Sequence, residues 1–164
     1  MPADHPNADT DVDEAERILQ QLRRAASALL TWSPRSTGAL RLQDALAGQE
    51  HRFDDCAEAL IGTDLTGVVA YWNGEAERLY GWSAAEAIGR PIEQLVVARR
   101  DEQLSRRIMR SICWTGHWEG DFWVLRRDGS TFCACVVHAV VEDDDGVPLG
   151  IFGVSRDTER PPRT

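Results

Sequence analysis

The stretch from Ala59 to Gly89, ALIGTDLTGVVAYWNGEAERLYGWSAAEAIG, carries the signals that decide the fold. Two short apolar runs separated by a Leu-Thr-Gly turn predict a β-hairpin. Asn73 follows the second run and suits the cap of a helix, because its side chain can accept a hydrogen bond from a free amide of the first turn. Ser83 and Glu86 have the spacing of a capping box for a second helix, and Gly89 supplies a left-handed stop.

The second half of the chain is typical of long antiparallel strands. Residues 120–132, GDFWVLRRDGSTF, predict a strand, an Asp-Gly hairpin and the start of the next strand. That next strand continues through residues 131–141 and is apolar on both faces, as expected for a strand that is covered on both sides. A turn at residues 143–146 leads to the last strand, VPLGIFGVSRDTER.

The order and spacing of these elements resemble those of a PAS domain, a sensory and dimerisation module. The resemblance covers roughly Phe53 to Arg160, and the Arg-Asp-Thr-Glu-Arg sequence at its end is similar to the family's exit motif. It implies an α+β fold in which a five-stranded antiparallel sheet has short helices on one face. We therefore expect the domain to span residues 53–160, followed by a short tail at 161–164.

The region before this domain has a different character. Residues 1–10 are acidic and contain proline, so we expect them to be disordered. Residues 11–52 have a helical pattern, and we expect them to cover the outer sheet face, to form a dimer contact, or both. The dimer seam would be a coiled coil in which apolar residues alternate at spacings of three and four: Ala15, Leu19, Leu22, Ala26 and Leu29.

The register of the PAS family implies which side chains point into the cup between sheet and helices. The expected lining is mainly apolar, which suits a small ligand pocket but equally suits a filled core. It consists of Ile61, Thr63, Tyr80, Phe122, Val124, Ala134, Val136, His138 and Ser155. Trp118 and Trp123 are expected on the strand that flanks the outer sheet face, where aromatic residues often anchor a partner, and packing in the core or under a covering segment is the favoured role for most of the tryptophans.

His138 occupies a position where related domains usually carry an aliphatic residue. A buried imidazole needs a hydrogen-bond partner, which can be a protein group of the core or a ligand. A metal site with Cys133 and Cys135 is disfavoured, because alternation places the two cysteines on the opposite strand face from His138. We expect no metal.

The cofactors known in the family can be compared with these residues. The flavin-binding photosensors need a cysteine at the position that Ile92 occupies here, and their switch glutamine corresponds to Ser155, so cysteinyl-flavin photochemistry is not expected. The haem-binding members use a histidine on the long helix, and residues 98–114 contain none. The sequence leaves open a noncovalent flavin, haem held from elsewhere, a small apolar or aromatic metabolite, or no ligand.

Composition narrows the functional class. The net charge of −9 argues against nonspecific nucleic-acid binding. All 18 basic residues are arginine, which we interpret as the codon bias of a GC-rich, bacterial genome. Because no apolar run is long enough to cross a bilayer and no signal segment is present, we expect a cytoplasmic protein with no membrane contact.

These observations favour a bacterial signalling module and not an enzyme, since no phosphate-binding loop, His-Glu-x-x-His sequence or nucleophile elbow is present. We expect a homodimer that acts on an effector, such as a phosphatase, kinase or transcription regulator, in the same chain or another. The first alternative is an interaction module with a solid core that binds no ligand. The second is a sensor that carries haem or flavin.

Overall fold

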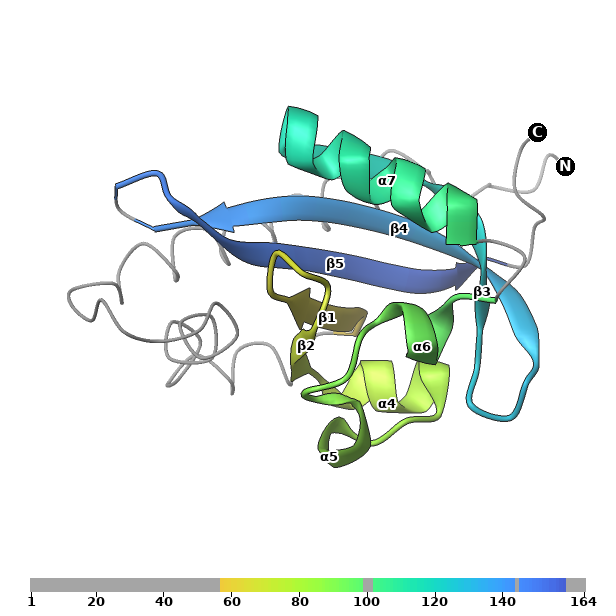
Figure 1. Ribbon diagram of the computed structural model, residues 1–164. Helices are drawn as coiled ribbons and strands as arrows, with labels where there is room; N and C mark the ends of the chain where they lie inside the picture. The colour runs from red at the N-terminus through yellow and green to blue at the C-terminus, as the bar shows by residue number, and fades with distance from the viewer. Residues whose placement is uncertain (1–56, 99–101, 144, 159–164) are drawn as a thin grey trace, which may run out of the picture.

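A single antiparallel sheet organises the part of the chain that the computed structural model describes, residues 57–98, 102–143 and 145–158 (Figure 1). Its five strands lie in the order β2-β1-β5-β4-β3, so the first and last strands in the sequence are neighbours at the centre. The strands are β1 (Ala59–Thr63), β2 (Val69–Trp72), β3 (His117–Leu125), β4 (Thr131–Glu142) and β5 (Pro148–Thr158). The helices are α4 (Gly74–Tyr80), α5 (Ala84–Ala87), α6 (Glu93–Val96) and α7 (Glu102–Thr115).

The starts of α4 and α5 follow from local sequence. The Asn73 side-chain oxygen accepts hydrogen bonds from the backbone amides of Ala76 and Leu60, both at 2.9 Å, so one amide group caps α4 and holds it against β1. Ser83 and Glu86 form the predicted capping box of α5. The predicted caps are confirmed, because each needs only side chains close in sequence to the amides they bind.

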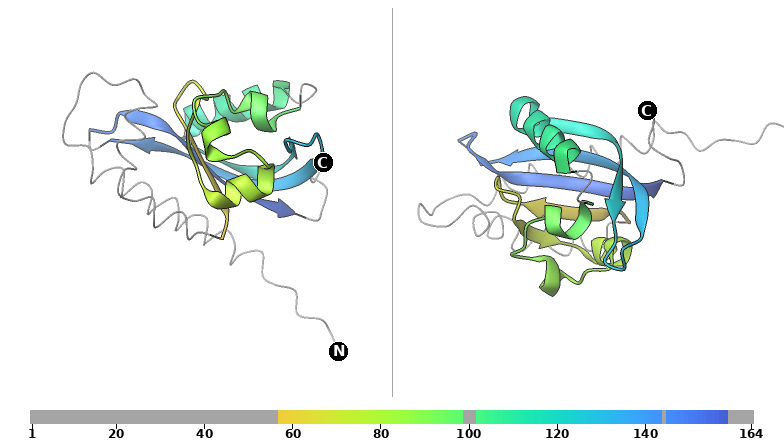
Figure 2. Two further views of the ribbon diagram at one scale, coloured as in Figure 1. Left: turned by 90° about the horizontal axis from the view of Figure 1, so that it is seen from below. Right: turned by 45° about the vertical axis from the view of Figure 1, so that its right-hand side comes forward.

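All four described helices lie on the same face of the sheet (Figure 2). Alternate residues along the strands point toward this face and form a core with α4, α5 and α6. Helix α7 is amphipathic: Ile108 and Ile112, four residues apart, are buried against Ile151, while Arg106 and Arg110 are exposed. The sheet and helices therefore enclose a volume between them.

The opposite, outer face of the sheet is apolar and buried. Phe152 and Leu60 are 0% exposed and Val137 is 5% exposed. A Cβ atom at Gly62 would lie 2.7 Å from the Phe152 ring, so only glycine leaves room for this ring on the neighbouring strand. The described helices do not account for the burial of this face, because they lie on the other one.

The sheet, its antiparallel pairing and the short helices confirm the predicted architecture. The expected disordered segment 1–10, the helical extension 11–52 with its dimer seam, and the tail 161–164 lie outside the described residues. Among the described helices, none has both the length and the apolar character needed to span a membrane.

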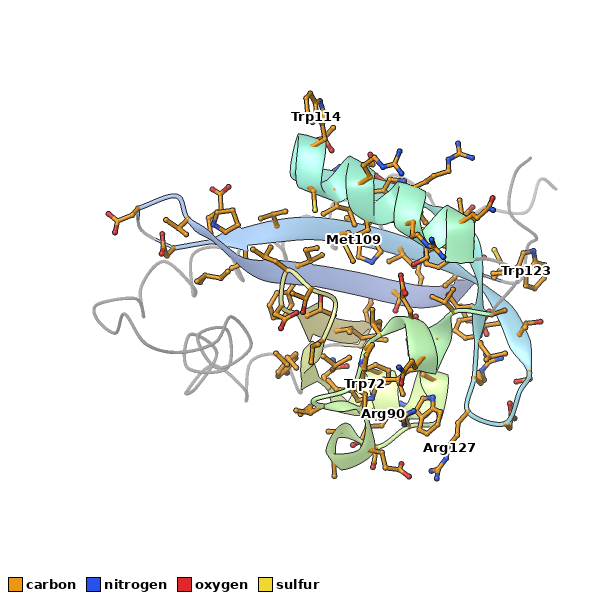
Figure 3. The ribbon with its side chains drawn as sticks, viewed as in Figure 1. Trp72, Arg90, Met109, Trp114, Trp123 and Arg127 are labelled. Atoms are coloured by element: carbon orange, nitrogen blue, oxygen red, sulfur yellow. The ribbon has the colours of Figure 1, made fainter. Side chains whose placement is uncertain are left out.

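The two tryptophans of β3 lie on opposite faces of the sheet. Trp118 lies on the inner face and packs against Phe122 and His138, with ring centroids 5.7 Å away in each case. Trp123 has the opposite parity and points outward, at 40% exposure (Figure 3). The reason is strand alternation: Trp118 is four residues before Phe122 in an uninterrupted strand, so the two side chains share a face.

Candidate functional site

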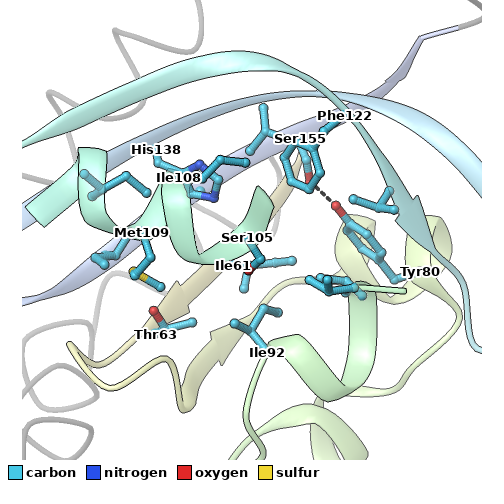
Figure 4. A pocket seen from close by; sticks show the side chains of 17 residues that line it. Ile61, Thr63, Tyr80, Ile92, Ser105, Ile108, Met109, Phe122, His138 and Ser155 are labelled. Atoms are coloured by element: carbon cyan, nitrogen blue, oxygen red, sulfur yellow. Dashed lines mark hydrogen bonds between the residues drawn. The ribbon is translucent and has the colours of Figure 1, made fainter. Parts of the chain in front are cut away.

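A cavity of about 80 Å³ lies between the inner sheet face and helices α6 and α7 (Figure 4). Strands β1, β3, β4 and β5 supply its floor, and the end of α4 contributes Tyr80. Its lining consists of Ile61, Thr63, Tyr80, Ile92, Val96, Val97, Ser105, Ile108, Met109, Ile112, Phe122, Val124, Val136, His138, Ile151, Gly153 and Ser155.

His138 is one of the polar side chains that line the cavity, and neighbours on both adjacent strands pack against its ring. It pairs across the sheet with Trp118 on β3 and with Gly153 on β5. A Cβ atom at Gly153 would lie 3.0 Å from the imidazole Cδ2 atom, so the ring lies directly over this glycine. The strand register therefore places the imidazole between Trp118 and Gly153, and the missing side chain of Gly153 leaves room for the ring.

One nitrogen of the imidazole ring has no hydrogen-bond partner among the described residues. Although His138 as a residue is partly exposed, its Nδ1 atom is buried and has no hydrogen-bond partner among the described residues. Leaving a buried polar atom unpaired costs about 1–3 kcal/mol. Burial, with a smaller contribution from the nearby His117, lowers the pKa of His138 to about 4, so the ring is neutral at pH 7.

A second polar pair closes the other side of the cavity. The Tyr80 hydroxyl donates a hydrogen bond of 2.9 Å to the Ser155 hydroxyl, joining the end of α4 to the last strand. Burial raises the pKa of Tyr80 to about 12, and the bond to Ser155 only partly opposes this effect. The phenol therefore stays protonated at neutral pH and donates.

The lining is electrically neutral. Among the residues that the structure describes, those at the cavity include no Asp, Glu, Lys or Arg. No group of three or more His, Cys, Asp or Glu side chains in the described ranges could hold a metal ion. An unpaired charge is strongly disfavoured in such surroundings, so the site suits an uncharged, mainly apolar molecule.

Eight of the nine residues expected at the pocket line this one cavity, although they are spread along the chain from residue 61 to residue 155. Ala134 does not: it is 0% exposed and belongs to the core beside the cavity. Whether the eight contact a ligand stays a prediction. Sequence reasoning missed the helical side of the lining, above all Ile108, Met109 and Ile112, although the spacing of the two isoleucines indicates a buried helix face.

The lining and the volume of the cavity restrict which of the family's cofactors it could hold. Ile92 lines it at the position where a photoactive flavin domain needs cysteine, and of the described cysteines 113, 133 and 135 none does. An engineered protein cavity of ~150 Å³ holds a single benzene ring. A cavity of about 80 Å³ is therefore too small, in this conformation, for the three fused rings of a flavin or for a haem.

Comparison with known families gives one assignment. A sequence model of the PAS fold matches residues 50–158. The chain is 36% identical over 104 residues to the two-component system protein A of Emericella nidulans. These residues make up 62% of this chain but 15% of the fungal protein, so the chain spans a small part of its relative's length.

Solved structures show the same fold. The PAS domain of a Colwellia psychrerythraea protein has a TM-score of 0.62 and 28% identity, covering 69% of this chain and 96% of that one. An RNA-binding light-oxygen-voltage receptor has a TM-score of 0.60 and 26% identity, covering 78% of this chain and 37% of the receptor.

Proposed function

The chain belongs to the PAS family, and we propose that it is a signalling module whose input is the occupancy of the inner cavity by a small, mainly apolar molecule. The observation that carries this proposal is the cavity of about 80 Å³ with a neutral lining from the sheet and both flanking helices. The proposed role is binding, without catalysis. Occupancy shifts the population between two arrangements of the domain only if the ligand binds one of them better.

The contacts around Tyr80 offer a route from the cavity to the end of the domain. Tyr80 lines the cavity and binds Ser155 on β5, and its ring packs against Phe132 with centroids 5.5 Å apart. The guanidinium of Arg126 lies 3.9 Å from the Phe132 ring centre and forms a 2.7 Å ion pair with Asp157. A ligand that displaces Tyr80 thus changes two connections to the last strand, at positions 155 and 157.

We further infer that residues 11–52 cover the outer sheet face and that the chain forms a homodimer through the 15–29 seam. The apolar, buried outer face supports the first part, since Phe152 and Leu60 are 0% exposed while the described helices lie on the other side.

The name of the fungal relative supports an effector of the two-component type, such as a kinase, with a phosphatase or transcription regulator as alternatives. We also propose that the protein is bacterial and acts in the cytoplasm.

Native mass spectrometry of the freshly purified 164-residue chain tests it. We expect a dimer that retains extra mass, because a ligand that fills an apolar cavity between the sheet and the helices dissociates slowly. If the chain carries no added mass and a screen of small uncharged molecules gives no binding, the sensory function is wrong.

The buried outer face also favours a second candidate, an interaction module that docks partners through the sheet and binds no ligand. In that case the same spectrum shows a dimer, but no small molecule changes its stability. Ligand-dependent stability therefore separates the two functions.

A further inference from the structure

Helix α7 carries an exposed row of basic and aromatic side chains, which we call the α7 stripe: Gln103, Arg107, Arg110 and Trp114. These residues are four, three and four positions apart, so at about 100° per residue they lie within about 60° of one another on the helix surface. All four are exposed, Trp114 at 90%, and Trp114 points away from the sheet (Figure 3). The opposite side of the helix carries Ile112, which is buried and lines the cavity.

The two arginines of the α7 stripe have no anion beside them. On a helix surface, a cation pairs most simply with a carboxylate three or four residues away. The positions at these spacings from Arg107 and Arg110 carry no Asp or Glu, and neither arginine forms an ion pair within the described ranges. Arg106 is exposed beside them and adds a third positive charge. Like charges at such spacings destabilise a helix, so an anion bound from outside α7 would relieve their repulsion.

Trp114 beside these cations makes the α7 stripe suitable for binding a protein segment. A single exposed apolar side chain is ordinary on a protein surface and indicates nothing by itself. Tryptophan and arginine together, however, are among the residues that contribute most to binding at protein interfaces. The stripe therefore fits an acidic segment that also brings an apolar side chain to the indole ring.

The N-terminal part of this chain contains a segment of that chemistry. Residues 4–14, which lie outside the described residues, contain no arginine and carry the carboxylates of Asp4, Asp9, Asp11, Asp13 and Glu14. Val12 supplies an apolar side chain among them. When extended, the segment spans up to about 33 Å, against about 16 Å along α7 from Gln103 to Trp114. It ends before Ala15, where the proposed dimer seam begins.

We propose that residues 4–14 dock on the α7 stripe, with carboxylates against Arg107 and Arg110 and with Val12 beside Trp114. Each exposed ion pair is weak by itself, but a tether within the chain or the dimer raises the effective concentration of the segment to about the millimolar range. The other side of α7 lines the cavity, so docking connects the N-terminal region to the helix that covers the site. The docking goes beyond the proposed function and needs no ligand in the cavity.

The absence of lysine from the sequence makes a direct test possible. Arg107→Lys introduces a single side-chain amine, which a zero-length carbodiimide couples to a carboxylate in contact with it. We expect peptide mass spectrometry of the full chain to find this amine joined to a carboxylate of residues 4–14, within one chain or between two chains of a dimer. Raising the salt concentration from about 0.02 M to about 0.5 M should lower the yield at least threefold, because exposed charges are then screened.

Arg78→Lys is the matched control, placed on α4. Arg78 is exposed and forms an ion pair with Glu75. The amine of this variant should therefore couple to Glu75 and not to residues 4–14, which shows both that the reagent reports contacts and that the acidic segment does not couple to every exposed amine.

Further variants test the two kinds of contact in the Arg107→Lys background. Removing four negative charges should lower the coupling at least fivefold, with the changes Asp9→Asn, Asp11→Asn, Asp13→Asn and Glu14→Gln. Trp114→Ala should lower it about threefold. Leu104→Ala, a change at a 40% exposed residue on another side of α7, should leave the yield within a factor of 1.5.

Two results would overturn the proposal. One is an Arg107→Lys amine that couples only to carboxylates outside residues 4–14, or to none, while Arg78→Lys couples to Glu75. The other is coupling to residues 4–14 that neither salt nor Trp114→Ala reduces, since chance encounters of a tethered segment would then explain it. Arg110→Lys repeats the test at the second cation of the stripe if Arg107→Lys fails to fold.

Discussion

At the scale of single residues, His138 departs most from what a protein core ordinarily contains. Its ring is enclosed by Trp118 and Gly153 on the neighbouring strands, and no described residue satisfies its buried Nδ1 atom. A core imidazole without a protein partner adds little to stability, because the cost of the unpaired atom offsets the packing of the ring.

Acid should therefore destabilise the protein through this residue. The pKa of His138 is about 4 in the folded chain and about 6.5 in the unfolded chain. Because the unfolded state binds the proton more readily, the contribution is fully present above pH 6.5 and is lost as the pH falls toward 4. The upper limit of the loss is about 3 kcal/mol. Urea unfolding at several pH values measures it.

His138→Leu is the control for this titration. The variant should be as stable as the original chain at pH 7, within about 1 kcal/mol, since no protein hydrogen bond is removed. It should also lack the loss of stability between pH 6.5 and 4.5. A loss of several kcal/mol at pH 7 would instead show that the histidine anchors the fold.

At the scale of elements, the junction of β1 and α4 depends on one amide side chain. Asn73 is 1% exposed, accepts hydrogen bonds from two backbone amides and donates one to the carbonyl of Glu58. Because α4 ends in Tyr80, which lines the cavity, this junction also positions the candidate site.

Asn73→Ala should cost about 2–4 kcal/mol, because it removes a helix cap and leaves further buried backbone groups unpaired. Ser83→Ala is the matched control: it removes the cap of α5, which is only partly buried, and should cost about 1 kcal/mol. Thermal and urea unfolding of both variants give the comparison. Equal losses would show that the bonds of Asn73 to β1 add nothing beyond a local cap.

At the scale of the whole molecule, the sheet has two apolar faces with different roles. The inner face encloses the cavity with α6 and α7, while the outer face carries fully buried residues such as Phe152. A large exposed apolar sheet face would promote association or aggregation. The covering that we propose from residues 11–52 would make the state of this face the output of the domain.

Deleting residues 1–38 should weaken self-association and expose apolar sheet surface. Light scattering after size exclusion reports the mass, and binding of a hydrophobic dye reports the exposed surface. Deleting only residues 1–10 is the control and should change neither. A 1–38 deletion that keeps the same mass and dye response would contradict both the seam and the covering role.

Much of the fold could be predicted because its signals are local. Strand alternation, the Asp-Gly hairpin and the caps at Asn73 and Ser83 involve residues within a few positions of one another. Parity and the family register place all nine expected residues on the inner side, and eight of them line the cavity. Parity also separates the two tryptophans of β3, with Trp118 inside and Trp123 outside.

The sequence by itself determined which residues form strands, where helices begin and which face of each strand is inward, since these depend on backbone geometry and side-chain spacing. Only the tertiary structure decided that a cavity remains between α7 and the sheet, that Ala134 lies outside its lining, and that Nδ1 of His138 lacks a partner among the described residues. The physical reason is that packing between distant segments sets both the volume left over and the partners available to a buried atom.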